Sequence, residues 1–237
     1  MEDISTKTFN KYIKALVDIS LAITTEQYEE DILKLIVMVT GKVLGVEICS
    51  LWMIDEDVRP RQIRLKASQT ISPEYMKERS LNLNEGVVGH VATTKKPLMI
   101  RDVLDEPLFK EKKMAEKLGL VSMLSVPLKV GEDKVVGVLN CFTSEPHEFS
   151  DAEVNMITAV ANQAAVAIKN TELMVKTRVI QEELEARKLV ERAKEVLMRR
   201  HHKSGEEAYK WIRKRSMDSR KSMRDVAEAI LISEEFQ

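Results

Sequence analysis

Residues 124–142 read LSVPLKVGEDKVVGVLNCF, two apolar runs separated by the polar segment GEDK at residues 131–134. Apolar runs of this length around a short segment with a glycine predict a β-hairpin. Residues 46–54 are apolar enough for a strand buried on both faces, and residues 62–67 alternate like a half-exposed strand. The centre of the chain is therefore predicted to consist largely of strands.

Helical patterns lie on both sides of these strands. Residues 5–20 and 28–43 each carry apolar side chains at helical spacing. A third helical pattern begins at Ser150, where Ser150 and Glu153 have the spacing of a capping box. Helices at both ends with strands between them predict an α+β domain.

The third helix is predicted to be unusually long, because no glycine or proline occurs between Pro146 and Gly205. A single helix over residues 151–200 would measure roughly 75 Å at 1.5 Å per residue, too long for one small domain. Apolar side chains continue along it, so we interpret it as a parallel coiled coil that joins two protomers into a homodimer. A broken helix in a monomer is the alternative.

Composition and charge restrict the class of protein. The chain has 237 residues and a net charge of −1, and 44% of its residues are hydrophobic, which suffices for a folded core. No apolar stretch reaches the roughly 18 residues that span a bilayer, and the acidic start does not resemble a signal peptide. Two cysteines do not make a disulfide framework. We therefore expect a cytoplasmic protein.

The charge is distributed unevenly. Residues 186–237 contain fourteen Lys and Arg against nine Asp and Glu, whereas residues 1–185 contain twenty-three against twenty-nine. A basic C-terminal module on an acidic body indicates a polyanionic partner, although a solvated helical face would give the same count.

The C-terminal segment is predicted to form a small three-helix bundle. Two short helical patterns follow Gly205 and begin with the spaced pairs Ser204/Glu207 and Ser222/Asp225. The predicted core positions are Val190, Ala193, Leu197, Ala208, Trp211, Ile212, Ser216, Met223, Val226, Ala227, Ile230 and Leu231.

Three stretches of this segment resemble the ANTAR family: VERAKEVLM at residues 190–198, EEAYKWIRKRSMD at 206–218 and MRDVAEAI at 223–230. The resemblance covers about residues 180–233. The sequence departs from the family pattern at Ser216, where alanine is usual, and at Trp211, where leucine is usual.

This resemblance implies RNA binding, because ANTAR proteins are bacterial antitermination regulators that bind hairpins in nascent leader RNA. Lys194 and Arg213 match basic positions of the family motif. Its packing positions correspond to Ala193, Leu197, Met198, Ala208, Met217 and Ala227. From charge and helical position, we add Arg199, Arg200, Lys210, Lys214, Arg220 and Lys221 as RNA-binding candidates, and Tyr209 because it lies beside them at helical spacing and tyrosine can stack on unpaired bases. Each of these could equally be a solvated surface side chain.

The middle of the chain resembles GAF domains, over roughly residues 22–172. Residues 81–103, LNLNEGVVGHVATTKKPLMIRDV, carry most of the resemblance. It implies an antiparallel sheet flanked by helices, often with a small molecule on one sheet face. The sequence does not identify such a ligand, and we expect no metal or other cofactor. We interpret Cys49 and Cys141 as buried, inert thiols, with a redox or chromophore role as the alternative.

The sequence therefore predicts an N-terminal helix at residues 1–21, a GAF sensory domain at 22–172, a connecting helix at 150–200 and an ANTAR domain at 180–237. No P-loop, Rossmann fingerprint or hydrolase motif is present, so we expect a non-enzymatic, signal-responsive antitermination regulator that binds leader hairpins. The alternatives are a DNA-binding regulator with a GAF sensor and a GAF-controlled protein-interaction switch.

Overall fold

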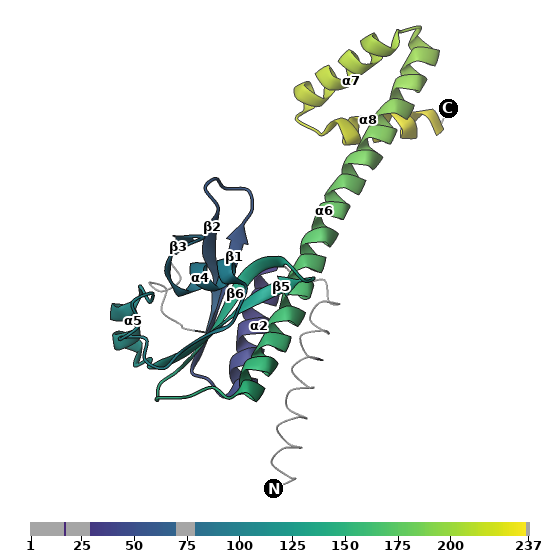
Figure 1. Ribbon diagram of the computed structural model, residues 1–237. Coiled ribbons are helices and arrows are strands. Elements are labelled where there is room, and N and C mark those ends of the chain that lie inside the picture. Colours follow the sequence, from purple (N-terminus) through teal and green to yellow (C-terminus); the bar gives the residue numbers. More distant parts are fainter. Residues whose placement is uncertain (1–16, 18–28, 70–78, 236–237) are drawn as a thin grey trace. The chain divides into compact units, whose positions relative to one another are not determined.

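The computed structural model describes residues 17, 29–69 and 79–235 (Figure 1). The helix predicted over residues 5–20 falls almost entirely outside them. The chain divides into two compact units, Met1–Glu172 and Leu173–Gln237. No helix among the described residues is both long enough and apolar enough to cross a membrane.

A six-stranded antiparallel sheet forms the centre of the first unit (Figure 1). Its strands are β1 (Ile48–Asp55), β2 (Gln62–Ser68), β3 (Ser80–Asn82), β4 (Leu98–Ile100), β5 (Ser122–Val130) and β6 (Lys134–Thr143). They lie in the order β3-β2-β1-β6-β5-β4. The predicted hairpin is confirmed as β5 and β6, which pair from Ser122 and Thr143 to Val130 and Lys134.

Helices cover both faces of the sheet. Helix α2 (Glu29–Leu44) and the first part of α6 (Asp151–His201) bury one face in a core that includes Ile36, Leu139 and Ile157. Helices α4 (Gly86–Thr94) and α5 (Lys112–Leu118) cover the other face. The predicted α+β class with helices flanking an antiparallel sheet is therefore confirmed.

Two glycines position the start of α4. Gly86 has φ +67°, a left-handed conformation that glycine adopts without steric cost. A Cβ atom at Gly89 would lie 2.7 Å from the carbonyl oxygen of Leu83, so a larger residue would push the helix away from the segment before it. Both glycines therefore have structural roles.

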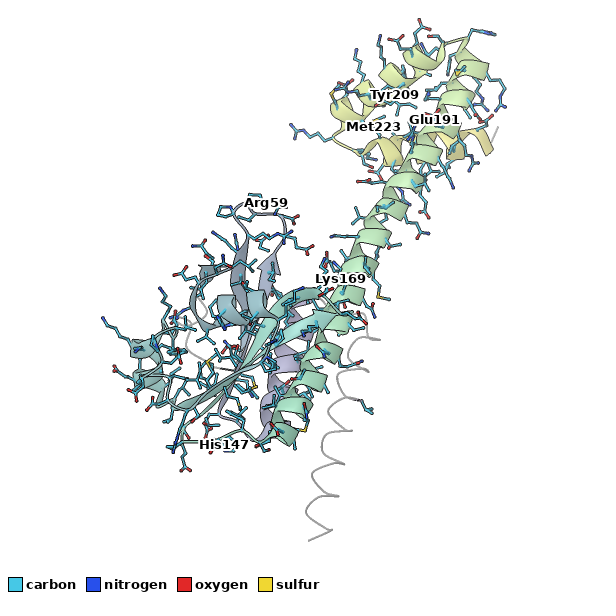
Figure 2. All side chains as sticks on the ribbon, in the orientation of Figure 1. Arg59, His147, Lys169, Glu191, Tyr209 and Met223 are labelled. Atoms are coloured by element: carbon cyan, nitrogen blue, oxygen red, sulfur yellow. The ribbon has the colours of Figure 1, made fainter. Side chains whose placement is uncertain are left out.

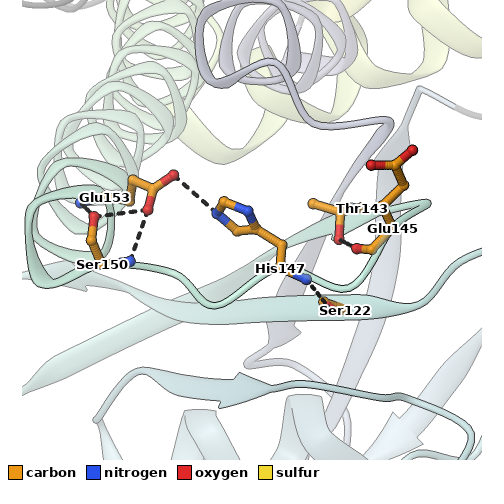
Figure 3. A network of polar contacts seen from close by, with 6 residues as sticks. All are labelled: Ser122, Thr143, Glu145, His147, Ser150 and Glu153. Atoms are coloured by element: carbon orange, nitrogen blue, oxygen red, sulfur yellow. Dashed lines mark hydrogen bonds and ion pairs between the residues drawn. The ribbon is translucent and has the colours of Figure 1, made fainter.

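A polar network fixes the first turn of α6 (Figure 3). Glu153 accepts hydrogen bonds from the backbone N–H and the hydroxyl of Ser150 at 2.7 and 2.8 Å, and its other oxygen lies 3.0 Å from His147 Nε2. Burial raises the pKa of Glu153, but the hydrogen bonds from Ser150 and His147 more than offset this, so the pKa lies below its ordinary value. The backbone N–H of His147 donates to Ser122 Oγ, which ties the network to β5.

Helix α6 runs without interruption for 51 residues, which confirms the predicted long helix and excludes a broken one. Its first part packs in the core of the first unit, and Val190, Ala193 and Leu197 near its end pack in the second. Between these parts, large apolar side chains lie 49–66% exposed: Leu173, Met174, Val175, Val179, Ile180 and Leu184.

Candidate nucleic-acid interface

The second unit is a bundle of the end of α6, α7 (Gly205–Ser219) and α8 (Met223–Glu235). Its buried core is small and contains Val190, Ala193, Leu197, Ala208, Ile212, Val226 and Ala227. Three of these seven residues are alanines, which let the helix backbones approach one another closely. The predicted all-α three-helix bundle is confirmed.

Capping residues fix both ends of α7. The hydroxyl of Ser204 accepts from the backbone N–H of Glu207, and the Glu207 carboxylate accepts from the backbone N–H of Ser204. Hydrogen bonds to the carboxylate from the backbone N–H and the side chain of Ser204 lower the pKa of Glu207. The helix ends at Arg220, which adopts a left-handed conformation with φ 55° although glycine is the usual residue there.

Three of the predicted RNA-binding cations are engaged in ion pairs within the bundle. Lys194 Nζ lies 2.8 Å from a Glu191 carboxylate oxygen, and only 19% of the Lys194 side chain is exposed. Arg199 pairs with Glu234 across the bundle. Lys210 pairs with Glu206 on α7 at 2.6 Å. Their charges are therefore partly compensated, and Lys194 presents little surface to a partner.

Another group of cations lies on the second half of α7 and on the turn to α8. We call it the α7–α8 basic cluster, and its members are Arg213, Lys214, Arg215, Arg220 and Lys221. All five side chains are exposed. None of them lies within ion-pair distance of a carboxylate among the described residues. Arg215 was not among the sequence-predicted RNA-binding residues, although it continues the basic run Arg213-Lys214.

The hydroxyl of Ser216 holds the turn in which the cluster ends. Ser216 Oγ donates a hydrogen bond of 2.6 Å to the carbonyl oxygen of Lys221, and Ser216 O accepts from the backbone N–H groups of Arg220 and Lys221. An alanine at this position would keep the two backbone bonds and lose the third. The departure from the family pattern at Ser216 therefore adds a contact beneath Arg220 and Lys221.

Aromatic side chains flank the cluster. Tyr209, labelled in Figure 2, is 43% exposed and lies one helical turn before Arg213. Trp211 is 40% exposed, so its predicted place in the bundle core is wrong. The centre of the α7 core face is occupied by Ala208 and Ile212, which leaves Trp211 at the rim.

Two predicted packing residues are also exposed, and both predictions require correction. Met217 is 64% exposed because it lies around the helix from the face that Ile212 buries. Met198 is 41% exposed, although its sulfur would lie 3.7 Å from a Cβ atom at Gly205. Arg200, another predicted RNA-binding residue, is exposed in the last turn of α6.

The first unit contains a second candidate site, on the sheet face beneath α4 and α5. A cavity of about 30 Å³ is lined there by Trp52, Val88, Phe109 and Asn140, among others. The buried Nε1 of Trp52 has no hydrogen-bond partner among the described residues. An acceptor atom of a small molecule or a water would satisfy this donor. The described residues contain no group of three or more His, Cys, Asp or Glu that could hold a metal ion.

An antiparallel α+β domain with helices on both faces, followed by a basic three-helix bundle, defines the architecture of the chain. The GAF domain model matches residues 29–168, more than half of the sequence. The ANTAR domain model matches residues 178–231. The chain therefore belongs to the GAF family and carries an ANTAR domain after the GAF domain.

Curated relatives each match part of the chain. Transcriptional regulatory protein PdtaR of Mycobacterium tuberculosis is 48% identical over 52 residues, which are 22% of this chain and 25% of the relative. The Nif-specific regulatory protein of Herbaspirillum seropedicae is 28% identical over 106 residues, which are 43% of this chain and 19% of the relative. The chain thus spans a quarter or less of the length of these relatives.

Solved structures share the GAF fold. The GAF domain of an Acinetobacter phosphoenolpyruvate-protein phosphotransferase is 25% identical, with a TM-score of 0.58, and the match covers 70% of this chain and 97% of that one. A free methionine-R-sulfoxide reductase from Neisseria meningitidis is 15% identical with a TM-score of 0.56, over 69% of this chain and 91% of that one. The likeness to the reductase shows a shared fold and nothing more about this chain. Because the reductase is an enzyme, the fold by itself does not indicate a function.

Proposed function

We propose that this protein is a non-enzymatic, signal-responsive antitermination regulator that binds hairpins of nascent leader RNA through the α7–α8 basic cluster. The observation that carries the proposal is the cluster itself, five exposed cations on the bundle that matches the ANTAR model. A relative that is 48% identical over 52 residues is named a transcriptional regulatory protein. A protein with this function acts in the cytoplasm, where bacterial transcripts are made.

The chemistry of the cluster suits a hairpin with an unpaired loop. Arginine and lysine neutralise phosphates, and the planar side chains of arginine and tyrosine stack on unpaired bases. Tyr209 and Arg213, one helical turn apart on α7, supply one aromatic and one cationic plane on the same side of the helix. The predicted residues Lys194, Arg199 and Lys210 would have to exchange their carboxylate partners for phosphate, so we expect them to contribute less.

The GAF domain is the proposed sensory module. Its signal would be a small molecule or a protein bound to the domain, and the cavity of about 30 Å³ beneath α4 and α5 would have to widen to admit a small molecule. Because α6 belongs to both the GAF core and the bundle, a change in the packing of α6 would reach the RNA-binding helices without a separate linker.

We further propose that the exposed middle of α6 pairs with the same segment of a second copy. Val166, Leu173 and Ile180 are exposed and seven residues apart, and Leu184 follows Ile180 by four, and both spacings occur on a coiled-coil seam. Leu173 and Ile180 are 50% and 65% exposed in the single chain. A parallel pair would bury them and would bring two bundles together, each able to bind one hairpin.

The oligomeric state tests this pairing. Light scattering of the full chain should give the mass of a dimer, and Ile180→Glu should give a monomer. The control variant Arg178→Glu introduces a glutamate at an exposed position two residues before Ile180, and this variant should remain dimeric. A full chain that is monomeric at micromolar concentration, with and without RNA, would rule the pairing out.

The RNA-binding proposal is tested by gel shift at about 0.15 M salt, where weak charge attraction is screened. The ligands are an RNA stem with an unpaired hexanucleotide loop, the same stem with a scrambled loop, and duplex DNA. The full chain should prefer the first ligand, and Arg213→Ala should weaken binding about tenfold. Arg59→Ala, which removes an exposed arginine from the first unit, should bind like the wild type.

Each remaining outcome contradicts the proposal. Equal binding to all three ligands would make the cluster a nonspecific polyanion surface, and preference for duplex DNA would favour a DNA-binding regulator. Binding to none of them would favour a GAF-controlled protein-interaction switch.

A further inference from the structure

Two cysteines lie opposite each other at the centre of the sheet. Cys49 on β1 and Cys141 on β6 are direct register partners, and their Sγ atoms are 3.4 Å apart. Both side chains are fully buried, on the sheet face that α2 and α6 cover. They are the two cysteines of the whole chain.

The backbone around Cys49 defines the geometry of the pair. The carbonyl oxygen of Cys49 accepts from the backbone N–H of Gln69 at 3.0 Å, and the N–H of Cys49 donates to Gln69 Oε1 at 2.7 Å. Both backbone groups of Cys49 therefore point away from β6, so Cys49 and Cys141 form a non-hydrogen-bonded pair. In such pairs the Cα atoms are about 4.5 Å apart, inside the range that a disulfide bridges.

We propose that Cys49 and Cys141 are a redox-active pair that a small peroxide converts to an intramolecular disulfide. The thiolate of one cysteine attacks a peroxide oxygen, which leaves a sulfenic acid on that sulfur and releases water after protonation. The second thiol attacks the sulfenic sulfur, forms the S–S bond and releases a second water. In total, two thiols lose two hydrogen atoms and one hydrogen peroxide is reduced to two waters.

Burial of the two thiols slows this reaction and limits which oxidants can reach them. Burial in the core, together with the neighbouring Cys141 thiol, raises the pKa of the Cys49 thiol well above its ordinary value. Thiolate is therefore scarce, and we expect oxidation over minutes to hours rather than seconds. A bulky disulfide such as oxidised glutathione does not fit between fully buried side chains, whereas hydrogen peroxide is little larger than water.

The disulfide would fasten the two central strands of the sheet. Cys49 and Cys141 are 92 residues apart in the chain, so their bond closes a long loop of the unfolded state. Closing a loop of this length stabilises the folded state, and we expect the Tm of the GAF domain to rise by about 5 °C or more. The sheet beneath α2 and α6 would become harder to open.

Thiol counting on the full-length protein tests the proposal. Reduced protein is treated with hydrogen peroxide, unfolded and alkylated with iodoacetamide, and its mass is measured intact and after proteolysis. Untreated protein should take up two alkyl groups and treated protein none, with one crosslinked peptide that contains both cysteines. Dithiothreitol should restore both alkylation sites and the original Tm.

Single-cysteine variants are the control. Cys49→Ala and Cys141→Ala remove one small buried side chain each, and circular dichroism before treatment confirms that they are folded. Each lacks the second thiol, so peroxide should give oxygen adducts of the remaining cysteine, no crosslinked peptide and no Tm increase. Two free thiols after a peroxide dose that oxidises the unfolded chain, a bond between two chains, or an unchanged Tm would each overturn the proposal. None of these readouts involves RNA, so the result is independent of the proposed function.

Discussion

The two units of the molecule bury very different amounts of apolar surface. In the first unit, both faces of the sheet are covered, and fully buried side chains such as Leu139 and Phe142 lie on opposite faces of the same strand. In the second unit, seven buried residues form the core, and three of them are alanines. Hydrophobic stabilisation is proportional to the apolar area removed from water, so the bundle has a much smaller share of it.

In the bundle, the residues that determine stability are different from the residues that form the proposed RNA-binding surface. Its core lies on the inner sides of α6, α7 and α8, whereas the α7–α8 basic cluster lies on exposed positions that contribute nothing to the core. Substitutions at core positions and at cluster positions should therefore have different effects on stability and on RNA binding. Core substitutions should unfold the bundle, and cluster substitutions should weaken RNA binding in a folded bundle.

The largest effect is expected for Ile212→Ala. Ile212 is fully buried, and truncation of a buried isoleucine costs about 2–5 kcal/mol, a large fraction of the stability of a core this small. Amide hydrogen exchange in α7 and α8 should become at least about 30-fold faster, which corresponds to about 2 kcal/mol, while exchange in β5 and β6 should not change.

The matched control for this substitution is Ile232→Ala on α8, where the same side chain is 54% exposed. We expect it to change stability by less than about 0.5 kcal/mol. Equal exchange rates in the Ile212→Ala and Ile232→Ala variants would mean that the bundle does not depend on its apolar core.

The two regions also differ in how well the sequence predicts them. Long segments with a clear period were predicted correctly, among them the hairpin of β5 and β6 and the helix from Ser150 onwards. β4 was not predicted, because its three residues pair with β5 at the sheet edge and are too short to show a period. Elements of that length are fixed by tertiary contacts rather than by local sequence.

In the bundle, the helices were predicted but the exposure of particular side chains was not. Helical spacing placed Trp211 in the core and the family resemblance placed Met217 there, yet a core this small has room for Ala208 and Ile212 alone on α7. The sequence likewise did not predict how little of Lys194 is exposed. It shows that Glu191 and Lys194 are three residues apart, but it does not show that the lysine side chain is largely buried. A helical pattern predicts in which direction a side chain points from the helix axis. How deeply that side chain is buried depends on the neighbouring helices.

A smaller effect, on binding alone, is expected for Arg220→Gly. Glycine adopts the left-handed conformation of this residue without steric cost, so the substitution should leave stability unchanged or raise it by up to about 1 kcal/mol. It also removes one cation of the cluster, and we expect the Kd for the RNA hairpin to rise about three- to tenfold.

Arg220→Ala provides the control, because it removes the same charge but keeps a side chain in the left-handed conformation. The two variants should bind RNA equally weakly, while the alanine variant should be less stable by about 1 kcal/mol. A folded Arg220→Gly variant with wild-type affinity would remove Arg220 from the proposed interface.

The smallest effect is expected for Ser216→Ala, which restores the residue that is usual in the ANTAR family. Loss of the 2.6 Å hydrogen bond to Lys221 O costs about 1 kcal/mol locally, but alanine has the higher helix propensity and offsets about half of it. Stability of the bundle as a whole should therefore change little, whereas the turn amides of Arg220 and Lys221 should exchange about fivefold faster. RNA affinity should fall about twofold, because two cations of the cluster are less firmly positioned.

Ser219→Ala separates this turn effect from a general effect of removing a hydroxyl from α7. The Ser219 hydroxyl donates to Arg215 O at 2.6 Å and lies 3.5 Å from Ser216 O, and both acceptors belong to α7 itself, so it does not bridge to the residues of the turn. Its loss should leave the exchange of the Arg220 and Lys221 amides and the RNA affinity unchanged. Equal behaviour of the two serine variants would mean that the Ser216 hydroxyl does not hold the turn. In that case, the backbone bonds from Arg220 and Lys221 to the carbonyl oxygens of Ser216 and Met217 would fix the positions of these cations.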